Sequence, residues 1–171
     1  EKYRIPQLAG AKSVFTIHNI EYQGRYGYQV LEDVIGLNHS YFNEGMLAQF
    51  GDVNLMKGAI LSSTFVTTVS PTYAKEIQTE FYGENLEGLM QSCEGRLYGV
   101  VNGLDMEEYN SELDGLIPVN FTVDDLEGKA QCKRMLQHEL WLSERDDVPL
   151  IGMVTRLTSH KGLDLVKYIV D

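Results

Sequence analysis

The amino-acid sequence predicts an α/β fold built on a doubly wound, mainly parallel sheet. Short runs rich in β-branched and apolar residues alternate with segments of helical spacing. This alternation is the usual sign of parallel strands joined by crossover helices. Hydrophobic residues make up 43% of the 171 residues, which is enough material for a core in at least one domain.

Three strands are expected in the first hundred residues. Residues 14–17 (VFTI) form the first, and residues 59–69 contain the end of a helix followed by the β-branched run TFVTTV. The third, residues 97–101, ends at Asn102-Gly103, a dipeptide typical of turns. Strands separated in this way favour parallel pairing.

Two helices are expected between the second and third strands. Ser70 is a suitable N-cap and Pro71 a suitable first residue for a helix that runs to about Phe81. Within this SPTY run, Thr72 is expected to assist the cap and Tyr73 to pack inward. Residues 86–93 indicate a second, shorter helix.

The character of the chain changes after Asp105. Residues 105–120 are acidic, rich in turn-forming residues and weakly periodic, which predicts a linker. A helix over residues 126–141 follows, with Thr122 or Asp124 as its cap. The acidic pair at 146–147 and Pro149 then end it.

Residues 150–166 (LIGMVTRLTSHKGLDLV) carry the most informative pattern. Residues 150–154 predict a buried strand, and Gly162 eases a turn into a helix. Arg156 and Lys161 in that turn suit an anion site above the strand end, with Arg as a fork and Lys as a movable charge. Spacing alone favours the alternative, that both cations are solvated surface charges.

Two further positions follow predicted strands. His18 stands at a strand end, where open α/β sheets place ligands, although a histidine beside Asn19 also has ordinary uses in turns. Asn102 occupies the same kind of position, and its dipeptide alone indicates only a turn.

Four motifs, in order along the chain, resemble those of bacterial glycogen synthases and plant starch synthases. SVFTIHNIEYQG at 13–24 resembles FTIHNxxYQG, and VSPTYAKEI at 69–77 resembles VSPTYAxEI. GVVNGLD at 99–105 resembles GxxNGxD, and RLTSHKGLDLV resembles RLTxQKGxDL, with His160 where the family has Gln. The motifs are long and spread over nearly the whole chain, so the resemblance is specific.

The resemblance implies two Rossmann-like domains of the GT-B type in a longer parent enzyme. Residues 1–104 would be the C-terminal part of the first domain, residues 105–147 the interdomain linker and helix, and residues 148–171 the start of the second. The family's Lys-x-Gly-Gly-Leu loop and its Glu-containing Pro-Cys-Gly-Leu motif are absent from this sequence. The expectation is therefore an internal fragment, inactive by itself.

The implied reaction transfers glucose from ADP-glucose to the non-reducing end of an α-1,4-glucan with retention at the anomeric carbon. By resemblance, Arg156 and Lys161 bind the phosphates and His18 contacts the transferred glucose. Asn102 would lie near the sugar. The remaining substrate-binding candidates, on the acceptor side, are Asn19, Tyr22, Gln23 and Gly24. No cofactor and no metal are implied.

The composition limits the classes of partner that the protein is expected to bind. Fourteen Lys and Arg against 25 Asp and Glu give a net charge of −11, which disfavours nucleic acids and anionic membranes. Cys93 and Cys132 fit neither a zinc site nor a disulfide framework, so both are expected as reduced thiols in the cytoplasm of a bacterium, or in a plastid if the source is a plant. No membrane-spanning stretch is evident.

Two alternatives to the synthase remain open. One is another nucleotide-sugar transferase of the same fold, such as a sucrose or trehalose-type synthase. The other is a truncated product that binds glucan without turnover. No pair of acidic residues indicates a glycoside hydrolase.

Overall fold

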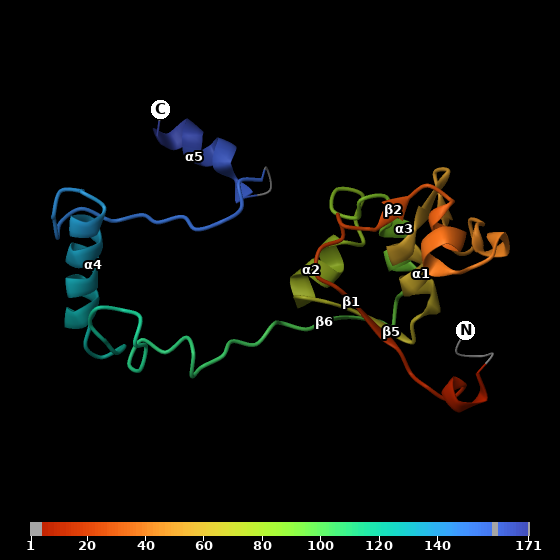
Figure 1. The fold of residues 1–171 in the computed structure, drawn as a ribbon, viewed down its shortest axis with the longest axis horizontal. Helices are drawn as coiled ribbons and strands as arrows, with labels where there is room; N and C mark the ends of the chain where they lie inside the picture. The colour runs from red at the N-terminus through yellow and green to blue at the C-terminus, as the bar shows by residue number, and fades with distance from the viewer. Residues whose placement is uncertain (1–4, 159–160, 171) are drawn as a thin grey trace. The chain divides into compact units, whose positions relative to one another are not determined.

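The computed structural model describes residues 5–158 and 161–170. The chain divides into two compact units, Glu1–Gly103 and Leu104–Asp171. Figure 1 shows the helices and strands of both units along the chain.

A three-stranded parallel sheet organises the first unit and confirms the predicted α/β class. Its strands are β1 (Val14–Ile17), β5 (Phe65–Thr68) and β6 (Leu97–Gly99), in the order β1-β5-β6. Both pairs are parallel, and the register aligns Ile17, Thr68 and Gly99. The third strand ends two residues earlier than the sequence pattern predicts.

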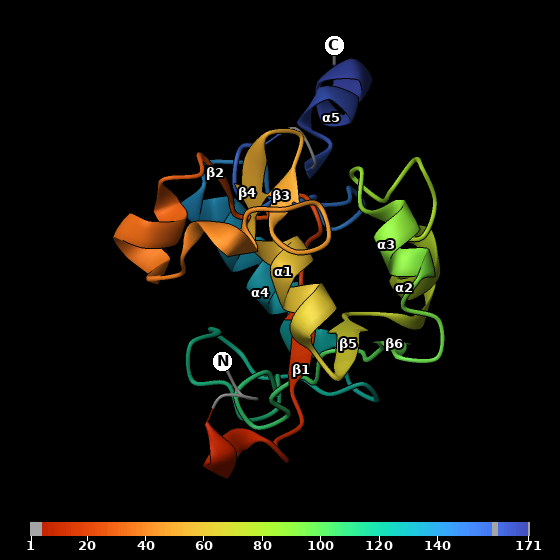
Figure 2. The same ribbon diagram turned by 90° about the vertical axis from the view of Figure 1, so that its right-hand side faces the viewer.

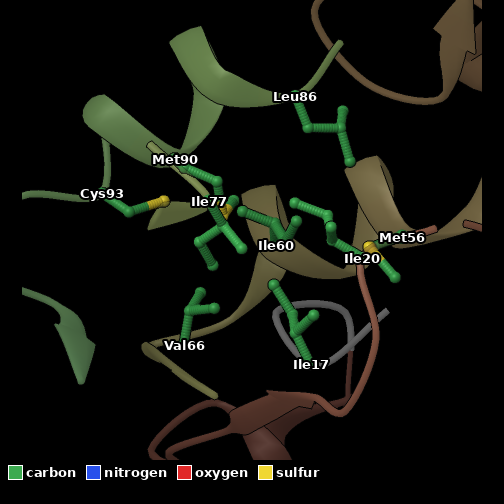
Figure 3. Packing of buried hydrophobic residues seen from close by; sticks show 9 residues of the cluster. All are labelled: Ile17, Ile20, Met56, Ile60, Val66, Ile77, Leu86, Met90 and Cys93. Atoms are coloured by element: carbon green, nitrogen blue, oxygen red, sulfur yellow. The ribbon is translucent and has the colours of Figure 1, made fainter. Parts of the chain in front are cut away.

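Alternating side chains place one face of this sheet in the core. Ile17 and Val66 are buried, whereas Val14 and Phe65 point to the exposed face. Helices α1 (Leu55–Ser62) and α3 (Glu87–Gln91) contribute to the buried side. Figure 3 shows the side chains of this cluster converging around Ile60: Ile17, Ile20, Met56, Ile60, Val66, Ile77, Leu86, Met90 and Cys93.

Helix α2 (Pro71–Glu76) begins where it was predicted and ends earlier than Phe81. The Ser70 side chain accepts a hydrogen bond from Tyr73 N at 2.9 Å, which confirms Ser70 as the N-cap. At the other end, the Thr79 hydroxyl and the Thr79 N–H both donate to Glu76 O. This local bonding competes with continued helix and closes the last turn.

We expect Ser70→Ala to lower the free energy of unfolding by about 1 kcal/mol, because an N–H in the first turn of α2 loses its side-chain acceptor. Thr72→Ala in the same turn is the matched control, since no hydrogen bond of the Thr72 hydroxyl is found within the described ranges. Chemical denaturation of both variants measures the difference. Equal stabilities would show that the cap contributes nothing.

A second, antiparallel sheet lies beside the first and was not predicted. It consists of β2 (Arg25–Tyr26), β3 (Ala48–Gln49) and β4 (Asp52–Asn54) in the order β2-β4-β3 (Figure 2). Phe50 and Gly51 join β3 to β4 with φ angles of 54° and 84°, the positive values of a tight two-residue hairpin.

Three short helical turns complete the first unit: η1 (Pro6–Leu8), η2 (Leu31–Ile35) and η3 (His39–Tyr41). The second and third of these pack with the antiparallel sheet around a smaller buried cluster of Leu31, Leu47 and Val53. This cluster anchors the segment between Gly24 and α1.

In the second unit, residues 105–120 contain turns but no helix or strand. Helix α4 (Glu127–Glu139) confirms the predicted helix, but its cap differs from the expectation. Thr122 Oγ1 accepts from the N–H groups of Asp124 and Asp125, so it forms a turn before the helix. Neither Thr122 nor Asp124 caps α4, because Leu126 is the N-cap residue and makes no side-chain cap bond.

The predicted strand over residues 150–154 is wrong for this structure, and helix α5 (Leu163–Val170) is confirmed. A strand needs a neighbour for its backbone hydrogen bonds, and the described part of this unit contains no other strand. Ile151 is 90% exposed and Val154 fully exposed. Gly162 has φ +68°, as the predicted turn requires.

None of the helices in the described part of the chain has the length and apolar character that a membrane crossing requires. Cys93 is free and buried, and Cys132 is free and partly buried. The assignment of residues 1–104, 105–147 and 148–171 to parts of a two-domain parent stays a prediction.

Candidate active site

Two of the predicted site residues, His18 and Asn102, follow the outer strands of the parallel sheet, β1 and β6, on the carboxyl side. Because Ile17, Thr68 and Gly99 are in register, His18 and Val100 emerge at the same edge, on the two outer strands. Adjacent strands lie about 4.8 Å apart, so these positions are about 10 Å apart across β5. Asn102 follows Val100 by two residues at this edge.

Buried hydrogen bonds fix the position from which His18 emerges. Thr68 Oγ1 donates to Ile17 O at 2.8 Å, and Thr68 O accepts from Val100 N at 2.7 Å. One buried threonine therefore ties the ends of all three strands. Beyond His18, Ile20 N donates to the Tyr73 hydroxyl of α2 at 3.1 Å, which holds the far side of the turn.

The side chain of His18 is exposed at this edge. No hydrogen bond or ion pair of its ring is found among the residues that the structure describes, so the ring is available to a ligand. Asn19 differs, because its Oδ1 accepts from Glu21 N at 2.9 Å and shapes the turn. Asn102 is exposed and lies after β6 in a segment that is neither helix nor strand.

The Tyr22–Gly24 turn contains an exposed residue directly before a buried one. Tyr22 is 55% exposed, whereas Gln23 is 7% exposed. Gly24 adopts φ +64°, and a Cβ there would lie 3.2 Å from Leu55 Cβ. Gly24 O and Gln23 O accept from Leu55 N and Met56 N, so the turn is fastened to the start of α1. Gln23 is placed as a structural group, and Tyr22 is free to contact a substrate.

Arg156 and Lys161 belong to the second unit, and both are exposed. Thr158 N donates to Arg156 O and Lys161 N donates to Thr158 O, each at 3.0 Å. These bonds link the backbones of Arg156 and Lys161 through Thr158, ahead of α5. His160, the departure from the family motif, lies outside the described residues.

Burial and hydrogen bonds shift the pKa values of several side chains. Burial raises the pKa of the Cys93 thiol. Backbone N–H groups of Glu108 and Glu107 hold the pKa of Asp105 below its ordinary value, and Arg134 does the same for Asp146. Asp105 follows Asn102 closely, and its bonds shape the turn there.

Within the described ranges, no group of three or more His, Cys, Asp or Glu side chains could hold a metal ion. The expectation that the chemistry needs no metal stays a prediction.

Comparison with known proteins identifies the family. The family model of the starch synthase catalytic domain matches residues 1–92, more than half of the chain. The chain belongs to the starch and glycogen synthase family. The predicted resemblance to this family is thereby confirmed.

Relatives extend the likeness over nearly the whole sequence. A glycogen synthase of Bacillus cereus is 46% identical over 170 residues, covering 99% of this chain and 36% of its own length. A glycogen synthase of Geobacillus thermodenitrificans is 48% identical over 155 residues, with 91% and 32% covered. The chain thus spans about a third of the length of the curated relatives it matches.

A solved structure shows the same fold. The catalytic domain of starch synthase IV from Arabidopsis thaliana, bound to ADP and acarbose, superposes with a TM-score of 0.87 at 34% identity. The superposition covers 95% of this chain and 34% of the other. The α/β architecture with its parallel sheet is therefore that of a starch synthase catalytic domain.

The sequence did not reveal the contacts that hold the site in place. Thr68 and Tyr73 support the His18 turn, and Asn54 is bonded to Gln23. Asn54 had a usable signal, because an Asn immediately before an apolar helical run is a typical N-cap. The tertiary contacts of Thr68 and Tyr73 leave no such local pattern.

Proposed function

We propose that the full-length protein is an α-1,4-glucan synthase that uses ADP-glucose as its donor. The observation that carries the proposal is the near-complete match of this chain to glycogen synthases, 46% identical over 170 residues. The exposed His18 at the carboxyl edge of the parallel sheet supports it, since ligands bind at that edge in open α/β folds.

In the proposed reaction, the bond between glucose C1 and the diphosphate breaks. A bond forms between C1 and the O4 oxygen of the non-reducing glucan end, and the proton of that hydroxyl passes to the departing diphosphate. Retention means that the new bond keeps the configuration of the old one. ADP leaves, and no cofactor beyond the nucleotide sugar is needed.

Charge stabilisation is the main contribution assigned to this chain. Arg156 and Lys161 offset the negative charge that develops on the departing diphosphate, Arg as a planar fork and Lys as a point charge. Such preorganised groups stabilise a transition state by several kcal/mol in a closed site. His18 hydrogen-bonds the transferred glucose, and Asn102 lies near the same sugar.

The donor and acceptor are tested together by measuring the nucleoside diphosphate that is released, ADP or UDP. The full-length protein is given ADP-glucose or UDP-glucose with glycogen, fructose or glucose 6-phosphate as acceptor. We expect turnover with ADP-glucose and glycogen. Turnover with a small sugar acceptor would favour the other nucleotide-sugar transferases, and glycogen binding without turnover under any condition would favour a non-catalytic glucan-binding protein.

A further inference from the structure

Three buried amide side chains form one hydrogen-bonded network beneath the Tyr22–Gly24 turn. Asn54 is fully buried, and Gln23 and Gln49 are each 7% exposed. Asn54 Nδ2 donates to Gln23 Oε1 at 2.6 Å and also to Gln49 Oε1. The two glutamines reach onward, because Gln23 Nε2 donates to Glu84 O and Gln49 Nε2 donates to Asn85 O, both at 2.8 Å.

The direction of every bond in this network is fixed. Backbone carbonyls only accept, so Nε2 of each glutamine must face the 84–85 loop and each Oε1 must face Asn54. Asn54 must then supply two N–H donors, while its Oδ1 accepts from Lys57 N at 2.9 Å and caps α1. Among the residues of this size, only asparagine provides both donors and the acceptor.

The network stabilises an unfavourable backbone conformation at Glu84 and Asn85. Glu84 and Asn85 are consecutive non-glycine residues with φ of 50° and 64°. Left-handed conformations of this kind cost about 1 kcal/mol or more each and persist where the surroundings impose them. Here the two buried glutamine amides bind the carbonyls of these two residues. Strain held in this manner is common at ligand-binding sites.

Exposed aromatic side chains flank both loops that the network joins. Tyr22 precedes Gln23 and is 55% exposed, and a hollow of about 270 Å³ beside it is lined by Phe15, Gly24 and Leu55 among others. On the other loop, Phe81 and Tyr82 are 82% and 46% exposed, with ring centroids 4.7 Å apart. Aromatic rings with a few polar groups are typical of small-molecule sites.

We propose that Asn54 is a positioning residue that joins the Tyr22–Gly24 turn and the 81–85 loop into one glucan-contact surface. The inference rests on the proposed function and assigns the acceptor's binding to this surface. Glu84 is exposed in the 81–85 loop, and the chain as a whole carries −11. Such a surface repels anions and suits a neutral ligand whose hydroxyls donate to carboxylates.

The test compares two Asn→Asp variants of the full-length protein. Asn54→Asp keeps the acceptor that caps α1 but removes both N–H donors. The Oε1 atoms of Gln23 and Gln49 then lose their hydrogen-bond donor. Asn38→Asp is the matched control, because Asn38 Oδ1 only accepts, from Ser40, as the N-cap of η3. Glycogen retention in affinity gels and the separate KM values for glucan and ADP-glucose are measured.

We expect Asn54→Asp to weaken glucan binding by about tenfold to a hundredfold, the usual effect of a buried polar group left without its partner. The KM for ADP-glucose should stay within about twofold, since the lost interaction serves only the acceptor. Asn38→Asp should change neither. A loss shared equally by both substrates, or unchanged glucan binding, would overturn the inference.

Two exposed tyrosines test the proposed surface, because replacing them should not destabilise the fold. Tyr22→Ala and Tyr82→Ala should each weaken glycogen retention, and Tyr98→Ala, half exposed on the open face of the sheet, should not. If Asn54→Asp does not fold, Gln49→Glu replaces it, because only the donor to Asn85 O is then removed. Normal retention in both tyrosine variants would refute the surface.

The retention assay also separates this inference from the proposed function. A wild-type protein that binds glycogen through these residues but transfers no glucose would refute the synthase and leave the surface standing. A wild-type protein that transfers glucose while Asn54→Asp, Tyr22→Ala and Tyr82→Ala all bind glycogen normally would refute the surface and leave the synthase standing.

Discussion

Replacing Arg156 or Lys161 by alanine in the full-length protein is expected to lower the rate of glucose transfer by about 10²–10³-fold for each change. Both residues are exposed, and backbone hydrogen bonds link each of them to Thr158. Neither therefore supports a core, and loss of either charge should act on the chemistry. Most of the effect should appear in kcat, because the charge on the diphosphate grows in the transition state.

Two other cations of the second unit provide controls. Lys167 lies in the last turn of α5, and Arg145 pairs with Asp147 at the surface. Lys167→Ala and Arg145→Ala remove the same charges from the same unit and should leave transfer within about twofold, as surface changes usually do. If all four variants lose activity alike, the effect is one of net charge and the phosphate assignment is wrong.

The second large effect is expected at Gly99, where alanine should destabilise the first unit by about 3 kcal/mol or more. A Cβ at Gly99 would lie 2.2 Å from Ser70 O and 2.3 Å from Pro71 N. These are backbone atoms at the start of α2, which the Ser70 cap and the Tyr73 contact hold in place. The strain has no flexible side chain to absorb it, so β6 and α2 must separate.

Gly103 supplies the comparison for this prediction. It lies four residues further along the same motif, and a Cβ there would meet nothing within 4 Å. Thermal unfolding of Gly99→Ala and Gly103→Ala, followed by circular dichroism, measures the difference. A Gly99→Ala variant as stable as Gly103→Ala would show that the close packing of β6 on α2 is not maintained in solution.

Local patterns in the sequence predicted the parallel sheet well. The β-branched run before Ser70 and the Ser70-Pro71 pair each carry their own signal, a strand followed by a capped helix. These elements could be located because neighbouring residues determine them. Their pairing in parallel followed from the intervening helices.

Elements that depend on distant partners could not be predicted in the same way. Residues 150–154 are as apolar as a buried strand, yet no strand forms because the described part of the second unit offers no neighbouring strand. Conversely, β2 and β3 are only two residues long and carry too little pattern to detect. The hairpin turn at Phe50-Gly51 lacks the Asn-Gly sequence that marks such turns.

The candidate site shows the same contrast between features set by neighbouring residues and features set by distant ones. His18 could be placed at a strand end from sequence, and β1 does end at Ile17. Asn102 lies three residues beyond the end of β6, and its place in the site stays a prediction. Gln23, expected to bind substrate, is instead buried and bonded to Asn54 and Glu84 O. That role depends on residues 31 and 61 positions away, which no local pattern reveals.

The most direct measurement is incorporation of labelled glucose from ADP-glucose into glycogen by the full-length protein, followed by digestion with an exo-acting enzyme specific for α-1,4 bonds. The account predicts that label enters the glucan and is released completely by this digestion, because each glucose is added with retention at a non-reducing end. Label that does not enter the glucan, or that resists the digestion, would contradict it.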